Sequence, residues 1–254
     1  MEIARAAAGL FVSRGLRATR AEDIAQAAGI APRTFYRYFA TKEEAVAPLY
    51  AAGAERWAEA VREAPAELPV PQALEHAVRH TLAPGRGVST ASWEWVRTLI
   101  RLAGTSPALG KVWAEVCHTA ETTLAEILRQ RADATGAEAA GTEAAGMDAT
   151  GTEAAGTDAA SSTLAPRALA PADGPSNALA PADVPSPHQR FTAAVASAAV
   201  RVAVESWAAT NTAPTGPQGP AELAMQNLRS LRGFAWEARP AEGEEEGAGE
   251  PEEA

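Results

Sequence analysis

Glycine and proline divide the first forty residues into three short segments with helical periodicity. Gly15 ends the first segment and Gly29 ends the second, because a glycine just past a helix readily adopts the conformation that closes it. Pro32 suits the first position of the third segment, where its missing N–H leaves no hydrogen bond unmade. Three helices of this length, with a glycine-containing turn between the second and third, predict a helix-turn-helix.

Two capping boxes mark further helix starts. Thr19 with Glu22 opens the second segment, and Thr41 with Glu44 opens a longer helix that continues through Trp57. In this motif the hydroxyl and the carboxylate satisfy main-chain N–H groups that a helix start leaves free. The residues expected to pack the second and third segments together are Ile24, Ala25, Ala28, Ile30, Phe35 and Phe39.

The opposite face of the third segment carries side chains that suit a DNA major groove. Arg33 and Arg37 can read guanine edges through two hydrogen bonds, and Thr34 can touch a base edge or a thymine methyl group. Tyr36 can bind phosphate oxygens, as can a helix N-terminus such as that at Thr41. The alternative for these side chains is a solvated helix surface with no ligand.

An ordered string of residues runs through all three segments. It consists of Leu10-Phe11, Arg14-Gly15, Ala18-Thr19, Asp23-Ile24-Ala25, Ala28-Gly29-Ile30, Thr34 to Phe39, and Lys42-Glu43. This string resembles the DNA-binding domain of the TetR family. The resemblance implies a recognition helix from Pro32 to Tyr38, with Arg33 and Thr34 facing bases. It also implies that Tyr36, Tyr38 and Lys42 hold the phosphate backbone, and that Thr19 or Arg20 adds contacts from the second segment. The predicted DNA-contacting residues are Thr19, Arg20, Arg33, Thr34, Tyr36, Arg37, Tyr38 and Lys42.

Helical periodicity returns after the helix that contains Trp57. The segments are 71–82, 93–103, 109–128, 190–209 and 220–236. These loosely resemble the acyl-CoA-like ligand-binding variant of the same family. That resemblance implies a homodimer whose last two helices form a four-helix interface, and a small-molecule effector that is apolar or acyl-CoA-like. Trp93, Trp113 and Trp207 are the candidate ligand-binding residues, although a helical core would use tryptophan in the same way.

The net charge of −10 is concentrated in two segments of low complexity. Residues 132–187 carry eight acids and one arginine within short repeats, and residues 237–254 carry eight glutamates and one arginine. Neither has enough large apolar residues to offset the entropy of folding, so both are predicted to be disordered. The acidity therefore does not exclude a basic DNA-facing surface on residues 1–50.

Signals for other functions are weak. The lone Cys117 cannot form an internal disulfide, and its neighbour His118 points to another side of a helix, so a catalytic pair is not expected. His76 and His80 have ligand spacing but no third ligand, so we expect no metal site and no cofactor. There is no nucleophile–base pair or phosphate-binding glycine loop, which argues against an enzyme. No signal peptide or apolar run of membrane-spanning length is found, so we expect a cytoplasmic protein.

These observations predict an all-α protein. Its expected parts are a TetR-type helix-turn-helix DNA-binding domain (1–46), a helical ligand-binding and dimerisation domain (47–131 and 188–236), a disordered low-complexity insertion (132–187) and a disordered acidic tail (237–254). The predicted function is a ligand-responsive transcriptional repressor that binds a near-palindromic DNA operator as a homodimer. The alternative is a small-molecule-binding or interaction protein with a decayed DNA-binding head. Ala31, which stands where the family places a capping serine, motivates that alternative.

Overall fold

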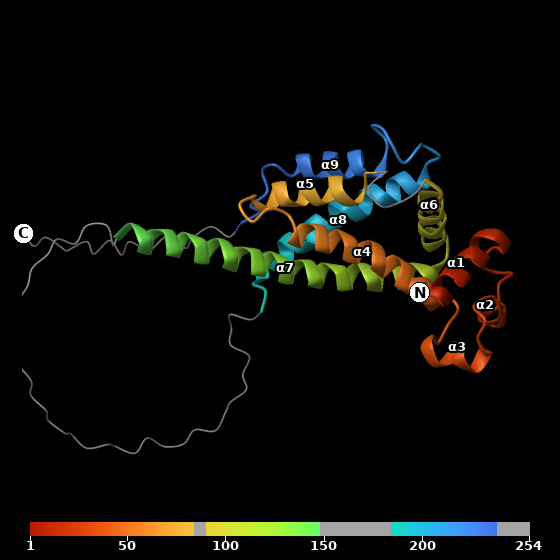
Figure 1. Cartoon of the computed structure of the whole chain (residues 1–254). Coiled ribbons are helices and arrows are strands. Elements are labelled where there is room, and N and C mark those ends of the chain that lie inside the picture. Colours follow the sequence, from red (N-terminus) through yellow and green to blue (C-terminus); the bar gives the residue numbers. More distant parts are fainter. Residues whose placement is uncertain (84–89, 148–183, 238–254) are drawn as a thin grey trace, which may run out of the picture.

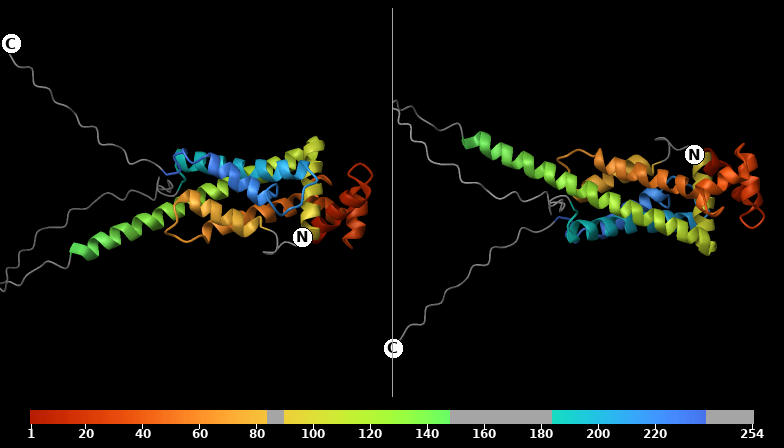
Figure 2. Two further views of the ribbon diagram at one scale, coloured as in Figure 1. Left: turned by 90° about the horizontal axis from the view of Figure 1, so that it is seen from above. Right: turned by 90° about the horizontal axis from the view of Figure 1, so that it is seen from below.

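The computed structural model describes residues 1–83, 90–147 and 184–237, without the side chains of 90–92 and 136–147. Every regular element in these ranges is helical, as predicted (Figure 1). The head contains α1 (Glu2–Arg14), α2 (Ala21–Ala27) and α3 (Pro32–Tyr38). Figure 2 shows this head at one end of an elongated body.

The body follows a short 3-10 helix η1 (Glu44–Val46). Its helices are α4 (Ala47–Arg62), α5 (Val70–Thr81), α6 (Thr90–Thr105), α7 (Pro107–Met147), α8 (Pro187–Ala209) and α9 (Pro220–Ser230). Each predicted segment has a counterpart, and most ends are shifted by a few residues; the exceptions are α7, which ends well beyond residue 128, and α9, which ends six residues before 236. No described helix is both long enough and apolar enough to cross a lipid bilayer.

Two hydrophobic clusters hold the molecule together. The larger cluster fills the body and takes residues from α4 to α9. Its buried members include Trp57, Leu124 and Trp207. The smaller centres on Phe11, Ile24 and Phe35 of the head. It also contains buried residues of α6 and α7, namely Leu99, Ala103, Leu109 and Val112. The head is therefore packed directly on the body, and α6 and α7 form its support.

Local capping chemistry explains where α8 begins. The Ser186 hydroxyl accepts a hydrogen bond from the Gln189 main-chain N–H at 3.1 Å, and the Gln189 side chain accepts one from the Ser186 N–H at 2.7 Å. Pro187 occupies the first helical position between them. This reciprocal pair starts the helix a few residues before the apolar repeat from which 190–209 was predicted.

The predicted insertion is wrong at its start. α7 does not stop near residue 131 but continues to Met147, beyond the other body helices (Figure 1). Seven of residues 132–147 are alanine, the residue with the highest helix propensity, so the segment can extend a helix already nucleated upstream. The rest of the predicted insertion, 148–183, and the tail after residue 237 lie outside the described residues.

Arg131 fastens α7 to the end of α4. Its guanidinium donates to the main-chain oxygens of Ala64 and Pro65, both at 2.7 Å, and to Leu68 at 3.2 Å. A further, longer bond of 3.4 Å reaches Val61. The carbonyls at the end of a helix have no hydrogen-bond donor within the helix. The Arg131 guanidinium provides donors for the carbonyls at and just after the end of α4.

Candidate DNA interface and ligand cavity

The turn between α2 and α3 is closed by the main chain. Gly29 has a φ of 67°, and the N–H of Ile30 donates to the carbonyl of Ala25 at 2.9 Å. A side chain at residue 29 would be strained in this left-handed conformation, so glycine is required here. The closed turn sets α3 across α2, with Phe35 fully buried beneath it.

The start of α2 is shifted by one residue from the prediction. Arg20, not Thr19, is the N-cap, and its N–H donates to the Asp23 carboxylate at 2.8 Å. The Thr19 side chain is fully buried, and its hydroxyl donates to the carbonyl of Gly15 at 2.9 Å. The prediction of a capping box at Thr19 and Glu22 is therefore wrong. Because the Thr19 hydroxyl is enclosed by the main chain of α1, we remove it from the candidate DNA contacts.

α3 has one buried and one exposed face. Phe35 faces inward and stacks near Phe39, with ring centroids 5.5 Å apart. Arg33, Tyr36, Arg37 and Tyr38 are exposed, and Thr34 is half-buried at the edge between the two faces. No side chain caps the start of α3 at Ala31, where Pro32 holds the first position instead. The structure thus gathers five of the predicted contacts on one helix, four of them exposed.

Hydrogen bonds preorganise part of this surface. The Tyr36 hydroxyl donates to the Glu22 carboxylate of α2 at 3.1 Å, and this bond raises the pKa of the Tyr36 phenol. The Arg37 guanidinium lies over the Tyr38 ring, 5.1 Å from its centroid. Both tyrosines are more than half exposed.

Lys42 holds the head together from within. Its ammonium donates to the carbonyl of Leu16 at 2.7 Å and to that of Thr19 at 2.8 Å, across the loop between α1 and α2. The resemblance implied a phosphate contact here, whereas the structure commits two of the three ammonium hydrogens to the protein. Beside it, Thr41 accepts from the Glu44 N–H, while the Glu44 carboxylate turns back to the N–H of Ala40. This is a variant of the predicted capping box, and it opens η1 before α4.

Known proteins share this arrangement of residues. Residues 3–47 match the family model described as "Bacterial regulatory proteins, tetR family". The head of this chain is a TetR-family domain. The match confirms the predicted family on the residues from which it was predicted.

Individual relatives match over different lengths. The HTH-type transcriptional repressor KstR2 of Mycobacterium tuberculosis is 51% identical over 45 residues, 18% of this chain and 22% of its own. The HTH-type transcriptional regulator TcmR of Streptomyces glaucescens is 32% identical over 135 residues, 51% of this chain and 58% of its own. The chain therefore matches about a fifth of the length of KstR2 and little more than half the length of TcmR.

Solved structures resemble the chain over most of its length. One is Thermus thermophilus FadR, described as a TetR-family transcriptional repressor in complex with lauroyl-CoA. It is 19% identical, covers 95% of this chain and 98% of its own, and has a TM-score of 0.49.

The body behind this TetR-family head contains a cavity of about 610 Å³. Its walls come from α1, α4, α5, α6, α7 and α8 and are mainly apolar. The aromatic lining residues are Tyr50, Trp57, Trp93, Trp95 and Trp113. Trp93 and Trp113 were predicted to bind ligand, and both line the cavity. Trp207 does not line it but packs edge-to-face on Trp93, with ring centroids 5.4 Å apart. The candidate role of Trp207 is therefore revised to the alternative, a core residue.

Sequence reasoning missed several lining residues. Tyr50 and Trp57 lie seven residues apart on α4, a spacing that puts them on one helix face and could have flagged them. The Tyr50 hydroxyl donates to the carbonyl of Leu99 at 2.8 Å, and burial raises the pKa of its phenol. Arg5 and Arg56 also line the cavity, from α1 and α4. They carried no signal in the sequence, because nothing there shows that the first helix reaches the cavity.

The wall formed by α7 and α8 carries a polar network. The Trp113 indole N–H donates to the Glu205 carboxylate at 2.6 Å, and Glu205 pairs with Arg201 at 3.3 Å. Cys117 lines the cavity beside them, and burial raises the pKa of its thiol to about 11. The thiol is therefore protonated near neutral pH, which suits a packing role better than a nucleophilic one.

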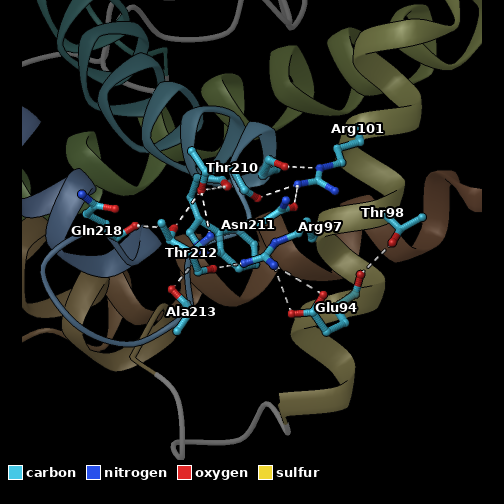
Figure 3. Close-up of polar contacts among 11 residues, drawn as sticks. Glu94, Arg97, Thr98, Arg101, Thr210, Asn211, Thr212, Ala213 and Gln218 are labelled. Atoms are coloured by element: carbon cyan, nitrogen blue, oxygen red, sulfur yellow. Dashed lines mark hydrogen bonds and ion pairs between the residues drawn. The ribbon is translucent and has the colours of Figure 1, made fainter.

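Polar contacts join α6 to the end of α8 (Figure 3). Arg101 donates to the carbonyls of Ala208 and Thr210 and to the side chain of Asn211 at 2.8 Å. Arg97, 6% exposed, donates to the carbonyl of Thr212 and stacks on Trp207, 4.2 Å from the ring centroid. α6 therefore cannot move relative to the C-terminus of α8 without breaking charged contacts.

The two histidines of α5 form no metal centre with their neighbours. The rings of His76 and His80 stack at 6.3 Å on the exposed face. Within the described residues, no three histidine, cysteine, aspartate or glutamate side chains gather closely enough to hold a metal ion.

Proposed function

We propose that this protein is a ligand-responsive transcriptional repressor that binds a near-palindromic DNA operator as a homodimer. The observation that carries the proposal is the exposed face of α3, where Arg33, Tyr36 and Arg37 stand on a helix anchored by Phe35. Arginine and tyrosine at the surface of such a helix read base edges and bind phosphates in a major groove. Arg20, Thr34 and Tyr38 complete the proposed contact set. Operator binding would place the protein in the cytoplasm.

Dimerisation is proposed through α8, together with α9. Phe191 and Val202 of α8 are 59% and 45% exposed, and eleven residues, or about three helical turns, separate them. Val195 and Ala198 lie half-buried on the same side between them. An apolar face of this kind is typical of a surface that a partner covers. Two copies related by a twofold axis would present recognition helices about 34 Å apart, one DNA turn.

An apolar effector is proposed for the cavity. Its volume is within the range of small-molecule pockets, and apolar side chains dominate its lining. Three lining residues, Trp57, Trp93 and Ser197, also carry a buried polar atom that has no partner among the described residues. Buried polar groups are nearly always hydrogen-bonded, so unpaired ones around a cavity favour a site that a ligand or water completes.

α6 is proposed to pass the effector's presence to the head. Trp93, Val96 and Ile100 of α6 line the cavity. On the same helix, Leu99 and Ala103 are buried in the head cluster. An effector that favours one position of α6 would therefore change the placement of the head and hence the spacing of the two recognition helices.

The test is binding to DNA upstream of the protein's own gene, compared with a shuffled duplex. Fluorescence anisotropy would be measured at fixed salt for the wild type, Arg33→Ala and Tyr36→Phe, with the exposed Arg79→Ala of α5 as the control. We expect specific binding, a loss of about tenfold or more for Arg33→Ala, and no change for the control. Equal, weak binding of both duplexes that no variant alters would reject the repressor. The body would then be the functional part, as in the decayed-head alternative.

A further inference from the structure

The charges around the cavity are unbalanced. Its lining includes three arginines, Arg5, Arg56 and Arg201, but a single acid, Glu121. Arg201 is paired with Glu205, which lies outside the lining. Among the described residues, neither Arg5 nor Arg56 forms a side-chain hydrogen bond or an ion pair. A guanidinium cannot give up its proton, so these two charges stay beside an apolar cavity without an acid to neutralise them.

Both arginines belong to helix faces that look toward the cavity. Arg5 follows Met1 by four residues, and both line it, so they share a face of α1. The next position on that face is Gly9, where a Cβ would lie 3.3 Å from the ring of Trp95, itself a lining residue. On α4, Arg56 follows Gly53 by three residues, and both line the cavity. Arg5 and Arg56 are exposed, which places them at its solvent-facing side.

We infer that the cavity takes an amphipathic anion, with its apolar body among the tryptophans and its anionic group bound by Arg5 and Arg56. Carboxylate, sulfonate and phosphate groups all accept the paired N–H donors that a guanidinium offers. This inference deepens the proposed effector site and rests on it. The charge of the ligand would then matter for regulation, because Arg5 belongs to the head and Arg56 to the body. An anion held by both ties α1 directly to α4.

The experiment compares two dyes that share one apolar body. 8-Anilino-1-naphthalenesulfonate carries a sulfonate, and N-phenyl-1-naphthylamine is the same ring system without it. Both become fluorescent in apolar surroundings, so their dissociation constants can be measured on the full chain without DNA. The variants are Arg5→Gln and Arg56→Gln. The matched controls are Arg14→Gln on α1 and Arg62→Gln on α4, since both arginines are exposed and neither lines the cavity.

We expect the wild type to bind the sulfonate dye more tightly than the neutral dye, by about tenfold. Arg5→Gln and Arg56→Gln should each remove several-fold of that preference while leaving the neutral dye unaffected. The controls should keep the wild-type ratio, and circular dichroism should show the same helix content throughout. A wild-type ratio near one, or a ratio that neither cavity variant lowers, would overturn the inference. Because no DNA is present, this outcome is independent of whether the protein binds an operator.

Discussion

Replacing Lys42 by methionine is expected to destabilise the head by about 2 kcal/mol. Methionine keeps the apolar stem but removes both hydrogen bonds, to Leu16 and Thr19. Bonds from a charged donor contribute about 1.5–3 kcal/mol each. Two such bonds would sum to about 3–6 kcal/mol, and because Lys42 is half-buried, water replaces part of what is lost and brings the expected cost to about 2 kcal/mol. The second lysine of the chain, Lys111 on α7, is exposed and provides the matched control, Lys111→Met.

Two measurements separate a loop clamp from a phosphate contact. Hydrogen exchange should show amides of α1 and α2 opening faster in Lys42→Met than in Lys111→Met, because opening tracks local stability. The salt dependence of binding to any duplex should be the same in both variants, since a lost phosphate contact would lower its slope by about one. Unchanged exchange together with a lower slope in Lys42→Met would refute the clamp and restore the phosphate contact.

Three further predictions concern the body. Gly219→Ala should lower the melting temperature by several degrees, because the new Cβ would lie 2.5 Å from a loop carbonyl oxygen, whereas Gly233→Ala, with nothing within 4 Å, should change little. Arg131→Met should cost about 2 kcal/mol in urea unfolding by removing the clamp on α4, against less than about 0.5 kcal/mol for the exposed, ion-paired Arg79→Met. Cys117 should react with iodoacetamide at pH 8 roughly a hundredfold more slowly than free cysteine, and its rate should rise up to about pH 11. Since folding raises this pKa, the thiol favours the folded state below about pH 8.5, and that contribution is lost as pH rises toward 11.

Local signals predicted the helices of the head well. Gly15, Gly29 and Pro32 act through main-chain conformation, which depends only on the residue itself and its immediate neighbours, so their positions could be read from the sequence. The cap could not be placed in this way, because Glu22 and Asp23 are adjacent carboxylates and either one can accept from the N–H of the residue three positions before it. In the structure the Thr19 hydroxyl donates to the carbonyl of Gly15, and the Arg20 N–H donates to the Asp23 carboxylate instead. That partner is visible only when the loop is folded.

The body shows a different limit. Apolar periodicity located its helices but gave no way to separate a cavity wall from solid core, since both use the same residues. Trp93 and Trp207 illustrate this, because they touch each other and yet only Trp93 lines the cavity. Low complexity was also a poor guide to the end of α7. It shows that a segment cannot build a core, but a helix that extends an existing one needs no core of its own.

Charge and position together suggest why an anion would suit this cavity better than a neutral effector. A ligand shifts a conformational equilibrium only by binding one state more tightly than the other. Apolar contacts with Trp57, which belongs to the body cluster, hardly depend on where the head lies. A contact with Arg5 does depend on it, because α1 carries that side chain while α4 carries Arg56. α6 provides a second route, through Leu99 in the head cluster. In a full test of coupling, the sulfonate dye should therefore change the affinity for DNA, whereas the neutral dye should act only through α6 and have the smaller effect.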